Sequence, residues 1–326
     1  MPAPSSDIPG RPAADSVFAA SGDLATEISR IADGDAANMQ SLHELDPDQV
    51  KGAKARKRLG VAFWVTVTIF GIIALAAILA PILPLKSYTA TVGRPKLAPS
   101  AQFWMGTDSL GRDIFSRVIW GGRVSLLVGF ASIALGILVG GTVGVIAGYF
   151  RGKTESVLMV AMDVLLSFPS LLLAIAIVGF SAEKSLTRIV FAIGVVSIAP
   201  VARLVRANTL VYSQREFVTA ARSLGASNFR IIRKEILPNV ILPVMSYAVI
   251  LVAIAIVGES ALAYIGLSVN EPTPTWGGMI ANGRPVLETA WWISIMPSLV
   301  LFVTVLCLNL AGDRIREFFD IKEGGL

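Results

Sequence analysis

Long apolar stretches alternate with short polar ones from residue 61 almost to the C-terminus. A helix needs about 20 consecutive apolar residues to cross a lipid bilayer. Six stretches approach or exceed that length: 61–83, 125–149, 157–180, 189–204, 240–267 and 292–310. The pattern therefore predicts an all-α membrane protein with six transmembrane helices.

A few residues interrupt the apolar pattern inside these predicted spans. Asp163 and Pro169 lie in the third span, Pro200 is expected to break or bend the fourth, and Glu259 lies near the far end of the fifth. An ionisable residue within a membrane is a functional hypothesis by default, so Asp163, Pro169 and Glu259 are candidates for a solute path or gate. Two alternatives stay open: Asp163 is tied to a neighbouring helix or loop, and Glu259 simply reaches the membrane interface.

The second predicted span carries a glycine at every fourth position. These glycines are Gly136, Gly140, Gly144 and Gly148. A spacing of four residues puts them on one helical face, where the absence of side chains lets a second helix approach closely in lipid. We therefore predict that they form a packing strip, in preference to lining a path.

Two regions beside the spans are expected to lie at the membrane surface. Ile114, Phe115, Val118 and Ile119 fall on one face of a short helix that precedes the second span. Residues 268–290 are rich in Pro and Gly and are expected to form a loop. Trp291 and Trp292 follow this loop and fit an interfacial aromatic belt.

The segment 213–239 is a charged island in an otherwise apolar sequence, and it predicts two short helices. Ser213 and Glu216 form the S-x-x-E pair of a capping box, which predicts a helix start, and Gly225 is the natural stop. Phe217, Ala220, Ala221 and Leu224 share one face of this first helix.

Ser227 is expected to cap the second helix of the island. That helix carries Phe229, Ile232 and Ile236, and it should end at Leu237–Pro238 because proline disfavours helix in the residue before it. The apolar face of the first helix either enters a groove on a partner protein or packs on its own chain.

Basic residues predict the orientation of the chain. Clusters at 51–58, at 151–153, along 213–239 and at 314–316 alternate with sparser loops, which places both termini in the cytoplasm. One loop disagrees, because it carries Lys86, Arg94, Lys96, Arg112 and Arg117. Residues 1–58 predict a largely disordered cytoplasmic tail whose basic end also contacts lipid headgroups, and residues 59–326 form the transmembrane domain.

Composition excludes several classes of protein. The chain is 54% hydrophobic and 16% charged, with a mean hydropathy of +0.69, whereas soluble domains average about 25% charged residues. The net charge of +5 does not indicate a nucleic-acid partner, because many basic residues lie beside apolar spans. One cysteine excludes an internal disulfide, and a single histidine argues against a metal site. No nucleotide-binding motif and no catalytic constellation is present, so the chain is not expected to be an enzyme alone.

The charged island resembles the EAA loop of ABC-transporter permease subunits. The matching residues are Ala220, Ala221, Gly225, Leu237 and Pro238. Thr219 stands where that pattern usually has glutamate, which puts one polar contact in doubt. The resemblance implies a coupling helix, within residues 213–239, that docks on an ATPase subunit. Its contact residues would be Glu216, Phe217, Thr219, Ala220, Ala221, Leu224, Gly225, Phe229 and Arg230.

Three further segments resemble the dipeptide and oligopeptide group of these permeases. The first, GTDxxGRDxxSRxxxGxRxSL, is matched by Asp108, Gly111, Arg112, Asp113, Ser116, Arg117, Gly121, Arg123 and Ser125. The second, PTPxWGxM, includes Pro272, Pro274 and Trp276, which by resemblance would face a binding protein. The third, LNLxGDxLRDxLDP, matches near the C-terminus from Leu308 to Arg316.

This resemblance implies a multi-pass subunit of the bacterial inner membrane with the type I ABC importer fold. Its partners would be a second permease subunit, two ATPase subunits that bind ATP and Mg, an extracytoplasmic binding (lipo)protein, a peptide substrate and membrane lipid. No cofactor and no nucleic acid is expected for this chain. Similar machinery imports nickel or other small solutes. A secondary transporter, which would need charge pairs in the membrane and inverted repeats, and a non-transporting scaffold are the remaining alternatives.

Overall fold

A computed structural model describes residues 60–180 and 185–323, with side chains up to residue 318. The predicted N-terminal tail and its basic cluster lie outside these residues, so both stay predictions. The described residues form these helices: α3 (Val61–Leu79), α4 (Ile114–Phe150), α5 (Gly152–Ser167), α6 (Ser170–Gly179), α7 (Leu186–Ser213), α8 (Glu216–Ser223), α9 (Asn228–Ile231), η1 (Ile232–Ile236), α10 (Leu237–Tyr264), α11 (Trp276–Gly283), η2 (Arg284–Val286) and α12 (Trp292–Glu323).

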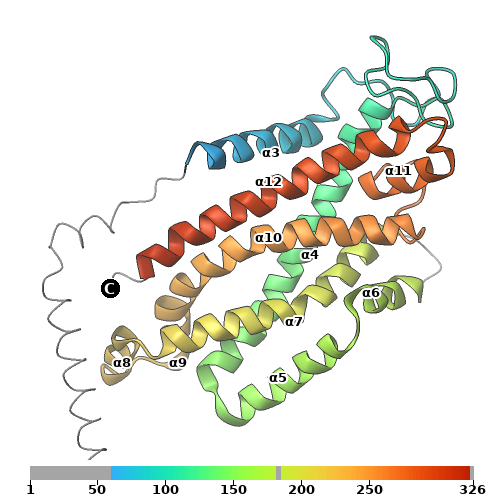
Figure 1. Ribbon diagram of the computed structural model, residues 1–326. Coiled ribbons are helices and arrows are strands. Elements are labelled where there is room, and N and C mark those ends of the chain that lie inside the picture. Colours follow the sequence, from blue (N-terminus) through green and yellow to red (C-terminus); the bar gives the residue numbers. More distant parts are fainter. Residues whose placement is uncertain (1–59, 181–184, 324–326) are drawn as a thin grey trace, which may run out of the picture. The chain divides into compact units, whose positions relative to one another are not determined.

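The described part of the chain is all-α, as the apolar pattern predicts. Five of its helices are long and apolar enough to cross a membrane, and the count rises to six when α5 and α6 are taken as one bent span. The long helices α3, α12, α10, α4 and α7 run through the bundle, and α4 crosses it obliquely (Figure 1).

The second predicted span is longer than expected, and the separate surface helix before it is a wrong prediction. Helix α4 is continuous over 37 residues, or about 55 Å. Ile114 and Val118, assigned to a membrane surface from sequence, are buried in the core instead. Gly121 and Gly122 do not interrupt the helix, and their missing side chains leave room for the backbone of Thr275 and the ring of Trp276.

The third and fourth predicted spans each contain a proline, but only the third is interrupted there. The third divides into α5 and α6, which meet at an angle of 84° beside Phe168 and Pro169. The fourth does not break, since α7 continues through Pro200 to Ser213. Pro200 removes one backbone hydrogen bond, and membrane helices tolerate such a loss where neighbouring groups compensate.

The glycine strip of α4 lies against α7. A β-carbon at Gly144 would lie 2.5 Å from the carbonyl oxygen of Ala202, and one at Gly148 would lie 2.7 Å from the Thr209 β-carbon. At Gly136 the distance to the Ser197 β-carbon would be 2.9 Å, and Gly140 lies directly against the Ile198 carbonyl. Real β-carbons do not approach this closely, so the geometry agrees with the predicted packing role.

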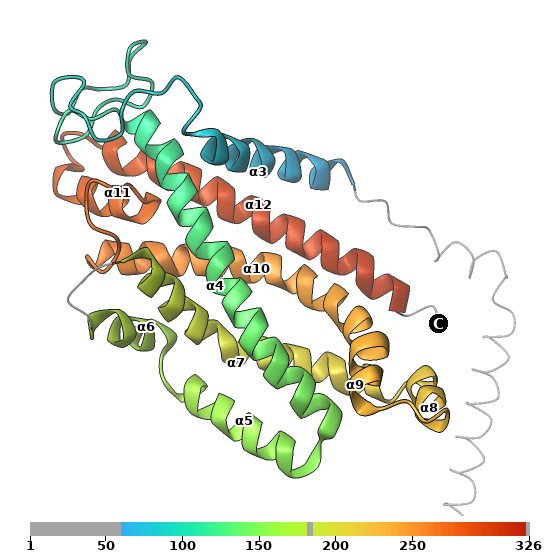
Figure 2. The ribbon, with the colours of Figure 1, turned by 180° about the vertical axis from the view of Figure 1, so that it is seen from behind.

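Two groups of short elements lie at opposite ends of the bundle. Helix α8 lies at one end, and α11 lies at the other beside the loop between α3 and α4 (Figures 1 and 2). The predicted loop 268–290 therefore contains a helix, α11, whose first turn is capped by Thr275. Trp291 is half-exposed as the predicted belt requires, whereas Trp292 is buried and donates its indole N–H to the Thr107 carbonyl at 3.4 Å.

Candidate functional site

Helix α8 begins two residues later than the capping-box prediction required. Ser213 is the last residue of α7, and its hydroxyl donates to the Leu210 carbonyl at 3.0 Å instead of capping a new helix. Arg215 occupies the N-cap position and makes no side-chain cap. The predicted stop is confirmed: Gly225 has φ +78°, and Ala226 N donates to the Ala221 carbonyl at 3.1 Å, which closes the helix in a Schellman-type turn.

Buried aliphatic residues attach the α8 region to the bundle. Val218 is only 1% exposed, and Ile231 and Ile236 are fully buried. Ala221 is partly buried against the same core. Sequence reasoning missed Val218 and Ile231, although Val218 and Ala221 have the i, i+3 spacing of a buried helical face.

A second apolar face of α8 points away from the core. Leu224 is 88% exposed and Phe217 is 39% exposed, and Phe229 on the following turn is 72% exposed. The predicted four-residue face is therefore corrected: Phe217, Ala220 and Leu224 lie outside, and Ala221 packs inward. Phe229 likewise does not share the buried face of Ile231 and Ile236. Exposed aromatic and aliphatic side chains on a short, anchored helix are the features of a surface that docks in a partner's groove.

The helix after α8 does not end at Leu237–Pro238, so that prediction is wrong. Ser227 caps it as expected, accepting from Arg230 N at 3.4 Å. One π-helical turn, Ile232–Ile236, then leads directly into α10, and Leu237 N donates to the Ile232 carbonyl. Pro238 lies just after this π-helical turn and lacks a backbone N–H, so it leaves one hydrogen bond of the continuous helix unmade. The chain from Asn228 to Tyr264 therefore reads as one helix.

Four of the remaining predicted docking residues are exposed around α8. They are Glu216, Thr219, Ala220 and Arg230. The predicted binding-protein contacts are less accessible. Trp276 is 1% exposed, and its indole N–H donates to the Val118 carbonyl at 2.9 Å, so in this structure it packs α11 against α4 and cannot contact another protein. Pro274 is also buried, which leaves Pro272 as the exposed member of the three.

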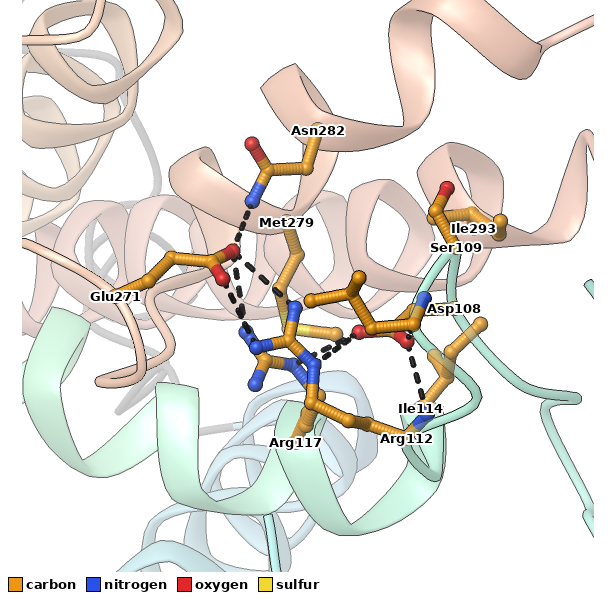
Figure 3. Close-up of a pocket in the computed structure, with 10 residues that line it drawn as sticks. Asp108, Ser109, Arg112, Ile114, Arg117, Glu271, Met279, Asn282 and Ile293 are labelled. Carbon is orange, nitrogen blue, oxygen red and sulfur yellow. Dashed lines mark hydrogen bonds and ion pairs between the residues drawn. The ribbon is translucent and has the colours of Figure 1, made fainter. Parts of the chain in front are cut away.

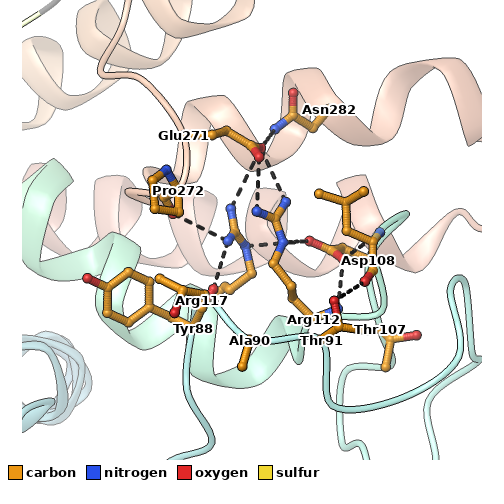
Figure 4. A network of polar contacts seen from close by, with 12 residues as sticks. Tyr88, Ala90, Thr91, Thr107, Asp108, Arg112, Arg117, Glu271, Pro272 and Asn282 are labelled. Atoms are coloured by element: carbon orange, nitrogen blue, oxygen red, sulfur yellow. Dashed lines mark hydrogen bonds and ion pairs between the residues drawn. The ribbon is translucent and has the colours of Figure 1, made fainter.

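A polar network joins distant segments at the end of the bundle opposite α8. Arg112 donates from Nε to Asp108 Oδ2 at 2.6 Å and from Nη1 to Glu271 Oε2 at 2.9 Å. Asn282 of α11 donates to Glu271 Oε1 at 2.7 Å, and Arg117 Nη1 donates to the Tyr88 carbonyl at 2.9 Å (Figure 4). The network thus ties the loop before α4 to α11.

Charge is balanced within this polar network. Hydrogen bonding from Arg112 lowers the pKa of the Glu271 carboxyl below its usual value. Burial acts to lower the pKa of Arg112, but bonds to Glu271 and Asp108 more than offset it, so that pKa is raised. A cavity of about 230 Å³ lies beside these groups, bordered by Ser109, Met279 and Ile293 (Figure 3). The sequence motif singled out Asp108, Arg112 and Arg117, but no local signal identified Glu271.

The three path candidates have different surroundings. Asp163 accepts from Arg203 of α7 at 2.5 Å, which matches the alternative of a tie to a neighbouring helix, and its side chain is half-exposed. Pro169 lies at the exposed break between α5 and α6. Glu259 is fully buried and accepts from the Ser268 hydroxyl at 2.9 Å and the Ser125 hydroxyl at 3.3 Å. Glu259 therefore links α10 to α4 and does not border an open path in this structure.

These features define a class of protein: a multi-span membrane protein that presents a short helix with exposed apolar side chains at one end. Solved structures share the fold. Two crystal forms of the MetNI methionine ABC transporter, in inward-facing conformations, match with TM-scores of 0.52 and 0.50 at 20% and 19% identity. The matches cover 63% and 62% of this chain and 97% and 96% of the matched chains.

The family follows from sequence comparison. Residues 140–322 match the family described as binding-protein-dependent transport system inner membrane component, and the chain belongs to that family. The glutathione transport system permease protein GsiD of Pectobacterium atrosepticum is 40% identical over 224 residues, which are 69% of this chain and 74% of that protein. The dipeptide transport system permease protein DppC of Alkalihalophilus pseudofirmus is 37% identical over 268 residues, 82% of this chain and 87% of that protein.

A third relative extends this comparison. The di/tripeptide transport system permease protein DppC of Pseudomonas aeruginosa is 40% identical over 222 residues, which are 68% of this chain and 73% of that protein. Both the family and the predicted resemblance to peptide-importer permeases are thus confirmed.

Proposed function

We propose that this chain is one of two membrane subunits of an ATP-driven importer and forms half of the path for di- or oligopeptides. Membership of the family supports the transport role. The names of three relatives, which refer to glutathione, dipeptides and di/tripeptides, support short peptides as the substrate class.

The observation that carries the proposal is the exposed apolar face of α8, formed by Phe217 and Leu224. It is held in place by the buried Val218 beneath it. Leu224 is a large apolar side chain, and it is 88% exposed beside an anchored helix. Covering it with a partner lowers the free energy of the complex by about 25 cal/mol for each Å² of apolar surface buried. Docking of an ATP-binding subunit on this face would cover Leu224.

The continuity of the helix after α8 suggests how docking is coupled to transport. The segment from Asn228 to Tyr264 is one helix, and it starts four residues after Leu224. When the partner ATPase subunits bind ATP and close on each other, a displacement of α8 would also move the N-terminal end of α10. The spans then shift between inward-facing and outward-facing populations, because each nucleotide state favours one of them.

The remaining parts of the machine are assigned to partners. ATP and Mg bind to two ATPase subunits, so this chain is not catalytic by itself and carries no cofactor. A second permease subunit completes the path, and an extracytoplasmic binding protein delivers the peptide. The chain is a multi-pass protein of the bacterial inner membrane with both termini in the cytoplasm, in contact with lipid but not with nucleic acid; the distribution of basic residues supports this orientation.

The test replaces Leu224 with aspartate in the complete complex. Leu224→Asp tests docking more specifically than a substitution of Ala221 would, because Ala221 also packs against the core of its own chain. A charge in a contact that excludes water costs several kcal/mol when unpaired, so docking should weaken at least tenfold. We expect loss of ATPase subunits on purification and loss of peptide uptake, with normal insertion of the chain.

The matched control is Ser223→Asp, which adds the same charge one residue away on the polar, exposed face of α8. This variant should retain the ATPase subunits and most of the uptake. Normal uptake and normal ATPase association of Leu224→Asp would contradict the proposal.

A further inference from the structure

Helix α5 is the least covered of the longer helices among the described residues. It packs mainly against α7 and α4, and Met162 is its one buried residue. Met162 lies in a small cluster with Ala199 and Ala202 of α7. Figure 2 shows α5 at the margin of the bundle, away from α3 and α12. Most of its surface is therefore left for lipid, water or another subunit.

The exposed surface of α5 has two chemically different faces. Val157 and Val164 are 70% and 56% exposed and form an apolar face suited to lipid. Ser156, Asp163 and Ser167 are also exposed, and their spacing of seven and four residues puts them together on a neighbouring stripe, which Val160, 58% exposed, borders on the apolar side. A polar stripe and an apolar stripe thus lie next to each other on the exposed surface, and neither is the side that carries Met162.

Asp163 and Arg203 place a charged pair on the polar side. Their side chains are 55% and 54% exposed, and Oδ1 lies 2.5 Å from Nη2. Asp163 lies about 16 Å along the helix axis from Gly152, and Arg203 lies about 15 Å before the end of α7. Charged groups on membrane-spanning helices face a protein interior or a water-filled cavity, because lipid does not solvate them.

The break between α5 and α6 leads independently to the same conclusion. Residues 167–172 are all exposed, and the chain turns by 84° there without a side-chain cap on α6. Irregular backbone at membrane depth leaves N–H and C=O groups without partners, and it occurs only inside protein or beside water. The uncovered break therefore does not face lipid.

We infer that the polar face of α5, with Arg203 of α7, borders the aqueous path of the assembled transporter. Arg203 can donate to a carboxylate and Asp163 can accept from an ammonium group, so the face fits a zwitterionic solute such as a free short peptide. This solute class rests on the proposed function, whereas the contact with water rests on the exposed charges and the exposed break.

The test measures thiol reactivity in the complete complex, in membrane vesicles and in a Cys307→Ala background. A thiol reacts with charged thiosulfonate reagents as its thiolate, which forms in water and not in lipid. Ser167→Cys should react at least tenfold faster than Val164→Cys on the apolar face, and Ser156→Cys faster than Val157→Cys. Ala101→Cys and Thr219→Cys, exposed at the two ends of the bundle, report sidedness.

A second measurement tests the electrostatic role of the pair. Asp163→Asn leaves Arg203 without its counter-charge, so the rate at Ser167→Cys should fall for a cationic reagent and rise for an anionic one. We expect the ratio of the two rates to change about threefold, corresponding to about 0.6 kcal/mol. Val164→Cys should show no such change.

Two results would overturn the inference. Equal rates at the polar and apolar positions would mean that the face is in lipid or at the headgroups. Slow reaction at both serine positions, in a complex that still hydrolyses ATP, would mean that a second subunit covers the face and excludes water. Either result leaves the proposed function standing, because that proposal depends on Leu224 and not on α5.

Discussion

Glu271 lies between two segments that are far apart in sequence. Arg112, from the loop before α4, and Asn282, from α11, both donate to its carboxylate. Arg112 is almost fully buried, so its charge depends on Asp108 and Glu271 for compensation. Removing Glu271 would leave the buried charge of Arg112 with one partner fewer, so it should cost more stability than removing an exposed carboxylate that has no buried partner.

We predict that Glu271→Gln destabilises the protein in a pH-dependent manner. The pKa of Glu271 is lowered in the folded state, so its contribution is present above the unfolded value of 4.5 and is lost as the pH falls through the lower folded value. The variant should lose about 1 kcal/mol at pH 7, because Glu271 is partly exposed. Thermal unfolding at pH 7 and near pH 3.5 should show this difference shrinking at the lower pH.

Glu288→Gln is the control for this experiment, since Glu288 is an exposed carboxylate outside the network. It should have little effect at either pH. A loss of stability by Glu271→Gln that is the same at both pH values would argue against an ionised Glu271 in the network.

At the residue scale, sequence reasoning worked where a role depends on local backbone. Gly225 was predicted from its permissive conformation and has a positive φ, and Ser227 was predicted as a cap and caps α9. It failed where the role depends on a distant partner. Trp276 bonds to Val118, which lies 158 residues earlier, and no local pattern distinguishes such a buried tryptophan from an exposed one.

At the element scale, α8 illustrates the limit of periodicity. A helical face can be recognised from spacing, but the spacing does not tell which face the rest of the protein covers. Val218 and Ala221 point inward, and Phe217 and Leu224 point outward. The prediction from sequence could not take the neighbouring helices into account, and it therefore combined these two faces into one.

Packing between α4 and α7 gives the element-scale prediction. Gly144→Leu should lower the yield of folded protein several-fold, because its side chain would meet the Ala202 carbonyl and the Val205 side chain. Overpacking of this kind costs about 1–3 kcal/mol or more. Yield in detergent, measured by fluorescence-detected size-exclusion chromatography, reports the effect.

Helix α4 offers a matched control for Gly144→Leu in Gly141→Leu. A β-carbon at Gly141 would meet only Ile137 of its own helix, at 3.9 Å. That variant should be produced nearly as well as the wild type. If both variants were produced equally well, close approach of α4 and α7 at Gly144 would not be required.

At the scale of the whole molecule, the apolar pattern predicted the fold class, since lipid demands long apolar helices, and the predicted six spans compare with five in the described residues, or six if α5 and α6 form one. The sequence did not reveal that the third apolar stretch divides into two helices at an angle of 84°, or that α4 extends beyond the membrane-length stretch. Such features depend on how helices pack on one another. The basic loop still disagrees with the predicted orientation: Arg112 and Arg117 lie beside Asp108 and Glu271, but the orientation rule counts Lys and Arg and not net charge.

The central claim is that the exposed face of α8 contacts an ATP-binding subunit. A photoreactive phenylalanine analogue in place of Leu224, in the co-expressed complex, tests it most directly. The account predicts a crosslink from position 224 to the ATPase subunit, stronger than the crosslink from the same analogue in place of Ser223. A complex that is intact and hydrolyses ATP, yet gives no crosslink from position 224, would contradict the account.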